Sequence, residues 1–358
     1  MIPQVLKSSH QDELSADIYN VHGLQNLSSP FPPLSWPFNS RPQPIHRIDA
    51  REQRDQAILK SGAYGLTIIS DPEEATVDIV LVHGLKGHAY RTWLHEGRGV
   101  YWPRDLLCSD FKDARIMVFG YEVNVWHPWN QVSQGWLSGY ADHLLGSLSG
   151  YRTSNLKSRP LVFIAHSLGG LVVQQALITS RDSRMDYLRM IETHTNGICF
   201  LGTPHRGASL ATWGERAARV LNFFKPVNHQ MVSLLDPRSK ALHEMRRAFH
   251  NVLEKRKEEG SRIKIVCFYE TVPLFRSCVV SEQSATIDGE PSFPIFANHG
   301  DMAKFASRQD DGYKSIVREI THIISDSDPG HLCSRCVCGL VTVYDVLAFC
   351  TPVLCKNK

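Results

Sequence analysis

Residues 159–177 read RPLVFIAHSLGGLVVQQAL, and this stretch decides the fold. The apolar run 161–165 has the character of a buried strand, and it leads directly into His166, Ser167 and two glycines. From Leu171 onward, apolar residues recur at helical spacing. A strand, a sharp turn at a serine and a helix are typical of a nucleophile elbow. We therefore predict that the Ser167 hydroxyl stands at the end of a strand as a nucleophile; the alternative is a Gly-containing turn with an incidental serine.

A serine hydroxyl needs a general base, and in this architecture the base follows the serine and the acid along the chain. His299 lies in the run FANHGD, between the last predicted strand and the last predicted helix. His243, His250 and His322 fall inside predicted helices. Only a loop at the sheet edge lets an imidazole reach the turn, so we predict that His299 is the base.

The acid that orients the base is expected at the end of the preceding strand. The apolar run 263–269 ends at Glu270, an ionisable residue at the carboxyl end of that strand. Glu282 and Asp288 follow the next short apolar run and are rivals for this role. We favour Glu270, with Glu282 second.

Backbone N–H groups are expected to stabilise the oxyanion of the reaction. One donor should come from Leu168, directly after the serine, and the other from the loop after an earlier strand. That strand and loop read IVLVHGLKGH, residues 79–88, and His83-Gly84 precedes Leu85. We predict Leu168 and Leu85 as the two donors; a plain Gly-rich turn is the alternative at 83–88.

The region between residues 64 and 324 alternates short β-branched runs with segments of helical period. This pattern predicts an α/β fold, a mostly parallel central sheet with helices on both faces in a single domain. Helices are expected over 239–259 and 313–324, where apolar residues recur every three or four positions. The predicted strands are 66–69, 78–82, 114–119, 161–165, 197–201, 263–269 and 278–280.

The two ends of the 358-residue chain differ from its middle. Residues 1–45 are rich in proline and lack an apolar period, so we expect a disordered leader before a domain over 46–326. Residues 327–358 hold five cysteines and are expected to form a poorly ordered tail. A zinc site there is disfavoured because the spacer 339–349 is mostly apolar; S-acylation is the other alternative.

Charge and hydropathy exclude several classes of protein. The net charge is +3, from 39 basic and 36 acidic residues, which predicts no nucleic-acid partner. No run reaches the ~20 apolar residues of a membrane-spanning helix, and the first residues lack a secretory layout, so we expect a soluble, cytoplasmic protein. Neither a cofactor nor a metal is expected, and the sequence does not disclose the oligomeric state.

The blocks VDIVLVHGLKGHAYRTW, AHSLGGLVVQQAL, GICFLGTPHRGA, FYET and ANHGDMAKF together resemble an α/β-hydrolase. More narrowly, the chain is similar to the lipase-like serine esterases that include the serine-active-site-containing proteins and the GPI inositol-deacylases. This resemblance implies a triad of Ser167, Glu270 and His299 and an ester substrate, most simply a lipid. It also implies peripheral association with mitochondrial or endoplasmic reticulum membranes.

Two alternative functions stay open. One is a non-catalytic interaction domain, because in fungi such domains often begin receptor-like proteins. The other is a transacylase that uses the same triad. The apolar segment 210–235 could be a lid or ordinary core. His205 and Arg206 are expected to support a turn beside the site rather than to act in catalysis.

Overall fold

The computed structural model describes residues 64–84, 87–121, 135–152, 158–207, 238–274 and 278–326. The predicted leader, the Cys-rich tail and the apolar segment 210–235 lie outside these residues, and so does Leu85.

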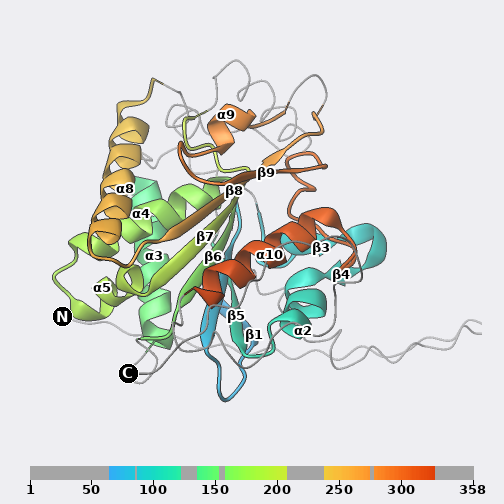
Figure 1. Cartoon of the computed structure of the whole chain (residues 1–358), viewed down its shortest axis with the longest axis horizontal. Coiled ribbons are helices and arrows are strands. Elements are labelled where there is room, and N and C mark those ends of the chain that lie inside the picture. Colours follow the sequence, from blue (N-terminus) through green and yellow to red (C-terminus); the bar gives the residue numbers. More distant parts are fainter. Residues whose placement is uncertain are drawn as a thin grey trace, which may run out of the picture. The chain divides into compact units, whose positions relative to one another are not determined.

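A seven-stranded sheet with the order β1-β5-β2-β6-β7-β8-β9 forms the centre of the described region (Figure 1). β1 pairs antiparallel with β5, and every other pair is parallel. Along the sheet, β5 therefore lies on one side of β2, and the later strands β6 to β9 follow in sequence order on the other side. The strands are β1 (Gly65–Ser70), β2 (Val77–Val82), β5 (Ala114–Gly120), β6 (Leu161–His166), β7 (Thr195–Leu201), β8 (Lys264–Glu270) and β9 (Ser292–Ile295), and a separate hairpin pairs β3 (Leu94–His95) with β4 (Val100–Tyr101).

The last strand corrects one prediction. The apolar run 278–280 is not a strand; β9 is formed instead by SFPI, residues 292–295, paired in parallel with β8. Val280 is fully buried, but its N–H donates to the Glu270 side chain and not to a sheet ladder. β9 escaped prediction because it is short, half-exposed and contains Pro294, which an edge strand tolerates.

Helices cover both faces of the sheet, as predicted (Figure 1). The predicted helices over 239–259 and 313–324 are confirmed as α8 and α10. The Ser239 side chain caps α8 by accepting the Leu242 N–H, and Gly260 (φ +72°) follows its C-terminus. One face holds α3 (Gly135–Tyr151), α4 (Leu168–Asp182), α5 (Asp186–Thr193) and α8 (Lys240–Glu258). The other face holds α10 (Asp311–Ser325) and α2 (Cys108–Asp110). The remaining short helical segments are η1 (Arg91–Trp93), η2 (Glu96–Arg98), η3 (Pro103–Leu107) and α9 (Glu282–Ala285).

Alternate residues of the central strands enter two separate cores. In β6, Phe163 and Ala165 face α3, α4 and α8, whereas Val162 and Ile164 face α10. All four are completely buried, which explains why β6 reads as a continuous apolar run. Burial on both faces fixes the register of β6 and therefore the position of the turn that follows it.

A buried ion cluster fastens the amino ends of the central strands. Asp78 in β2 is fully buried and accepts hydrogen bonds from three guanidinium groups, those of Arg115, Arg152 and Arg159. Arg115 belongs to β5, and the other two lie between α3 and β6. One carboxylate thus joins three segments at the end of the sheet opposite Ser167.

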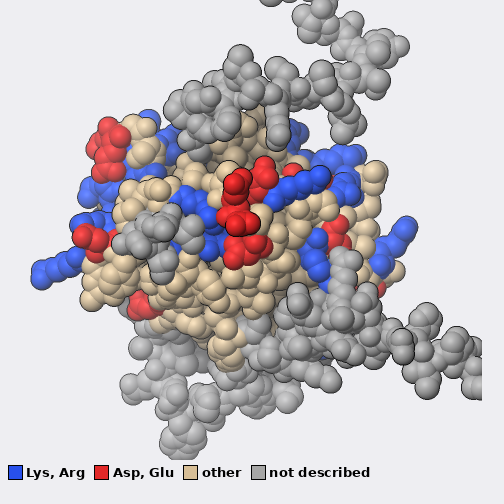
Figure 2. Space-filling model, turned by 90° about the horizontal axis from the view of Figure 1, so that it is seen from below, with Lys and Arg blue, Asp and Glu red and all other residues tan. Residues whose placement is uncertain are grey.

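No helix in the described part of the chain combines the length and apolar character that a membrane crossing requires. The face in Figure 2 carries acidic and basic side chains side by side, in keeping with the near balance of charges in the sequence.

We predict that Asp78→Ala lowers the free energy of unfolding by about 3–5 kcal/mol, because the buried guanidinium groups of the cluster lose the carboxylate that they share. Urea denaturation followed by circular dichroism measures the change. The control is Asp186→Ala, which removes an exposed ion pair with Arg189 and should cost about 1 kcal/mol or less. Equal losses in the two variants would contradict a structural role for the cluster.

Candidate active site

The candidate site begins at a strained serine. Ser167 joins β6 directly to α4 with φ 53° and ψ −128°, and it is the one non-glycine residue with positive φ in the described ranges. An L-residue in this region of φ/ψ space is strained, and such strain concentrates at functional sites. Its N–H donates to the Leu201 carbonyl of β7 at 2.8 Å, which holds the turn against the neighbouring strand.

The turn is possible only because its neighbours are small. A Cβ added to Gly169 would lie 2.3 Å from the His83 carbonyl oxygen and 2.6 Å from that of Val82. A Cβ on Gly84 would lie 2.6 Å from the Cβ of Ser167. The loop after β2 therefore packs directly against the serine, where the sequence places the oxyanion loop.

His299 reaches Ser167 from a loop 132 residues further along the chain. The loop connects β9 to α10, and the His299 Nε2 atom lies 2.9 Å from the Ser167 Oγ. The other ring nitrogen, Nδ1, lies 3.5 Å from Oε2 of Glu270. The structure thus brings together the three side chains that the sequence selects, in the order hydroxyl, imidazole, carboxylate.

Glu270 ends β8 and is buried beside the imidazole. Its Oε1 accepts the Val280 N–H at 2.7 Å, which fixes the carboxylate. Oε2 and the His299 Nδ1 are both buried, and neither has a hydrogen bond within the described residues. The two atoms face each other at 3.5 Å, and a shift of a few tenths of an ångström would let Nδ1–H donate a hydrogen bond to Oε2. Catalytic hydrogen bonds are often long in unliganded sites.

The rivals of Glu270 lie elsewhere. Glu282 is exposed in the first turn of α9. Asp288 is exposed and forms an ion pair with Arg206.

Two contacts that sequence reasoning missed position the imidazole. His166, one residue before the serine, donates from Nε2 to the His299 carbonyl at 2.8 Å. Burial lowers the pKa of His166 to about 3, with a further contribution from the nearby His299, so the ring stays neutral. Gly202 (φ +60°) packs against the imidazole, because a Cβ there would lie 3.0 Å from the His299 Cε1. The only signals in the sequence are a histidine in the turn and a glycine directly after an apolar strand.

The loop after β2 is shaped by His83. Its Nδ1 donates to the Gly84 carbonyl at 2.8 Å, and its Nε2 accepts the Tyr121 N–H at 3.3 Å. Its ring stacks on that of Tyr121 with 4.4 Å between the centroids. Burial lowers the pKa of His83 to about 4, which keeps this ring neutral too. Of the two predicted donors, Leu168 is the first residue of α4, so its N–H has no partner within the helix; Leu85 lies outside the described residues.

His205 supports the turn after β7. The Gln174 side chain of α4 donates to its Nδ1 at 2.7 Å, and its backbone N–H donates to the Ser284 carbonyl at 2.8 Å. It is buried, and none of its contacts involves Ser167, His299 or Glu270. Burial, with the charges of Arg206 and Arg246, lowers its pKa to about 3.

A metal ion has no obvious place here: the described residues contain no group of three His, Cys, Asp or Glu side chains placed to hold one.

A mostly parallel sheet between two helical layers and a serine on a strained strand-to-helix turn together define an α/β-hydrolase fold. Residues 73–232 match the family model described as "Putative serine esterase (DUF676)". The predicted resemblance to the lipase-like serine esterases of the α/β-hydrolase superfamily is confirmed by this match.

Protein SERAC1 from Mus musculus is 26% identical over 249 residues, which cover 63% of this chain and 36% of that protein. Protein SERAC1 from Danio rerio is 25% identical over 268 residues, covering 68% and 38%. The chain thus spans little more than a third of the length of the curated relatives it matches.

Among solved structures, MenH from S. aureus is similar at a TM-score of 0.38 and 12% identity, covering 74% of this chain and 99% of that one. The enol-lactonase from Burkholderia xenovorans LB400 is similar at 0.36 and 15%, covering 73% and 95%. At these scores the two structures say nothing about the site of this chain.

We predict that Gly169→Ala destabilises the protein by more than about 2 kcal/mol, because the new methyl group meets backbone oxygens that cannot move aside. Gly146→Ala in α3 is the matched control, since its Cβ would meet nothing within 4 Å. That control should be neutral or stabilising by up to about 1 kcal/mol. Thermal unfolding compares them, and a Gly169→Ala variant as stable as the control would contradict the close approach.

The buried neutral histidines predict a pH dependence of stability. His83, His166 and His205 bind a proton below about pH 4 when folded but near 6.5 when unfolded. Between these values the unfolded state holds more protons, so stability is complete above pH 6.5 and falls as the pH decreases. Each histidine adds up to about 1.4 kcal/mol per pH unit to this slope.

Urea titrations from pH 7 to 4.5 measure the slope. His205→Gln should flatten it, because the variant lacks one buried site for a proton, whereas His250→Gln, at an exposed position of α8, should leave it unchanged. Identical slopes for wild type and His205→Gln would contradict the assignment.

Proposed function

We propose that the chain is a carboxylic ester hydrolase that works through Ser167, His299 and Glu270. The observation that carries this proposal is the strained Ser167, with its Oγ 2.9 Å from the His299 imidazole, whose other nitrogen faces a buried carboxylate. The family match and the resemblance of the motifs support the same chemistry. A serine esterase needs this arrangement because a hydroxyl is a weak nucleophile until a base removes its proton.

In the first half of the reaction, the Ser167 Oγ attacks the ester carbonyl carbon and His299 Nε2 takes the hydroxyl proton. Glu270 stabilises the imidazolium from the Nδ1 side. The negative charge on the carbonyl oxygen is held by the Leu168 N–H, at the positive end of α4, and by that of Leu85. The tetrahedral intermediate then expels the alcohol, which takes the proton from His299, and an acyl-serine remains.

In the second half, water attacks the acyl-serine and gives a proton to His299. Collapse of the second tetrahedral intermediate breaks the bond to Ser167 Oγ, which recovers its proton, and the carboxylic acid leaves. His166 and Gly202 hold the imidazole in place through both halves, since one fixes its backbone carbonyl and the other packs on its ring.

The proposed substrates are acyl esters of lipids. The resemblance in sequence suggests this class, and one feature of the site supports it. Phe296, three residues before His299 in the same loop, is 91% exposed. We propose that this exposed apolar ring contacts the acyl chain of the substrate.

The proposal predicts that Ser167→Ala and His299→Gln each lower kcat/KM for ester hydrolysis by at least about 10³-fold. Glu270→Gln should lower it by about 10³–10⁴-fold, because an amide no longer stabilises the imidazolium. Glu282→Gln is the matched control and should hydrolyse esters like the wild type. The assay uses p-nitrophenyl esters from acetate to palmitate, and the longer chains should give the higher kcat/KM.

Three outcomes contradict parts of the account. Loss of activity in Glu282→Gln but not in Glu270→Gln would transfer the acid's role to Glu282. A preference for acetate would contradict the lipid substrate. A folded wild type that hydrolyses no ester would leave the non-catalytic interaction domain as the better account.

A further inference from the structure

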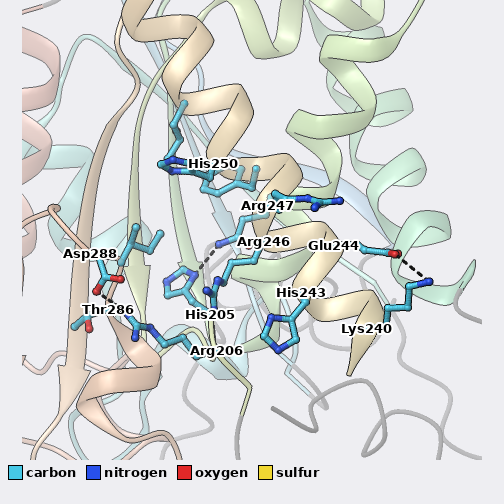
Figure 3. Close-up of a pocket in the computed structure, with 14 residues that line it drawn as sticks. His205, Arg206, Lys240, His243, Glu244, Arg246, Arg247, His250, Thr286 and Asp288 are labelled. Atoms are coloured by element: carbon cyan, nitrogen blue, oxygen red, sulfur yellow. Dashed lines mark hydrogen bonds and ion pairs between the residues drawn. The ribbon is translucent and has the colours of Figure 1, made fainter. Parts of the chain in front are cut away.

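A large cavity in the described part of the chain lies apart from the candidate active site. It measures about 710 Å³ and lies between α8, the turn after β7 and the segment that follows α9 (Figure 3). Ser167, His299 and Glu270 are not among its lining residues. A cavity of this size holds a small organic molecule.

Basic side chains dominate the wall of the cavity. Four cationic side chains line it against two carboxylates, and both carboxylates are engaged. Asp288 pairs with Arg206, and Glu244 pairs with Lys240 at the other rim. Arg246 has neither an ion pair nor a hydrogen bond within the described residues, and in Figure 3 it extends from α8 toward His205 and Arg206.

The positive charge gathers at one place in the cavity. The guanidinium groups of Arg206 and Arg246 both act on the buried His205, whose low pKa reflects them after the effect of burial. His205 itself is neutral at physiological pH and takes a hydrogen bond from Gln174. The guanidinium groups of Arg206 and Arg246 therefore both lie near His205. Of the two carboxylates that line the cavity, only that of Asp288 forms an ion pair with one of these groups.

Three apolar side chains also line the cavity. Phe249 and Leu253 of α8 are largely buried, and Ile287 is half-buried. A ligand that fills the cavity thus meets both cationic and hydrocarbon groups. Guanidinium groups bind phosphate oxygens in a planar, two-point manner that suits two converging arginines.

We propose that this cavity is a second binding site, for an organic phosphate whose phosphate group lies between Arg206 and Arg246 and whose apolar part contacts Phe249 and Ile287. The phosphate can belong to a free phosphomonoester or to a phospholipid headgroup. The site goes beyond the proposed hydrolase activity, since it uses none of the residues assigned to that reaction.

The test measures binding of phenyl phosphate to the full chain by isothermal titration calorimetry. Arg246→Gln should weaken binding by at least about 10-fold, because it removes a guanidinium that no ion pair within the described residues engages. Asp288→Asn should tighten binding by about 3-fold, because it removes the carboxylate that competes for Arg206. Lys255→Gln is the matched control: it removes one exposed positive charge from the same helix outside the cavity, and its affinity should equal that of the wild type.

Two further arms separate the sources of the phosphate and the roles of the wall. Inorganic phosphate should bind more weakly than phenyl phosphate, because it cannot use the apolar side. Co-sedimentation with phosphatidylcholine vesicles, with and without phosphatidic acid, measures binding to a lipid headgroup. If binding of phenyl phosphate depends on Arg246, the site takes a free phosphomonoester; if binding of the acidic vesicles depends on Arg246, it takes a phospholipid headgroup.

The proposal is overturned if the wild type binds neither phenyl phosphate nor the acidic vesicles. It is also overturned if Arg246→Gln and Lys255→Gln bind alike, or if Asp288→Asn weakens binding. Thermal unfolding of each variant verifies that it is folded. Because binding requires no turnover, these results are independent of whether the chain hydrolyses esters.

Discussion

The arrangement of the site depends on one backbone constraint, the passage from β6 to α4 within the single residue Ser167. Because α4 begins directly after Ser167, the reversal from strand to helix falls on this one residue, which adopts a positive φ. The strain is sustained by surroundings that leave little freedom: a hydrogen bond to Leu201, and glycines at 84 and 169 that let the backbone of the β2 loop touch the turn. The buried cluster around Asp78 fastens the opposite end of the same strands.

The same constraint explains how residues distant in sequence meet. Parallel strands end at one edge of the sheet, so the segments after β2, β6, β7, β8 and β9 all arrive beside Ser167. Each supplies one element: a loop against the serine, the serine itself, Gly202 against the imidazole, Glu270, and the loop with His299. His166 then joins the strand of the serine to the loop of the imidazole by a hydrogen bond between a neutral ring and a carbonyl. Because burial keeps that ring neutral, the link places no second positive charge beside His299.

Much of this arrangement was predictable, because the sheet's central strands are buried on both faces and therefore read as continuous apolar runs. The turn at Ser167 was predictable from a strand that ends in small residues before a helical period. The edge strand β9 was not, since a short, half-exposed segment with a proline carries no such signal, while the apolar run at 278–280 is buried in a turn. The contacts of His166 and Gly202 escaped prediction for another reason: each depends on a loop more than ninety positions away, which no local pattern encodes.

We propose that Ser167 is a nucleophile activated by His299. The most direct test of this proposal is the reaction of the folded protein with a fluorophosphonate, followed by digestion and mass spectrometry of the peptides. The account predicts one adduct, located on Ser167, that forms much more slowly when His299 is replaced by glutamine. A folded protein that forms no adduct, or one that forms it at another serine, would contradict the account.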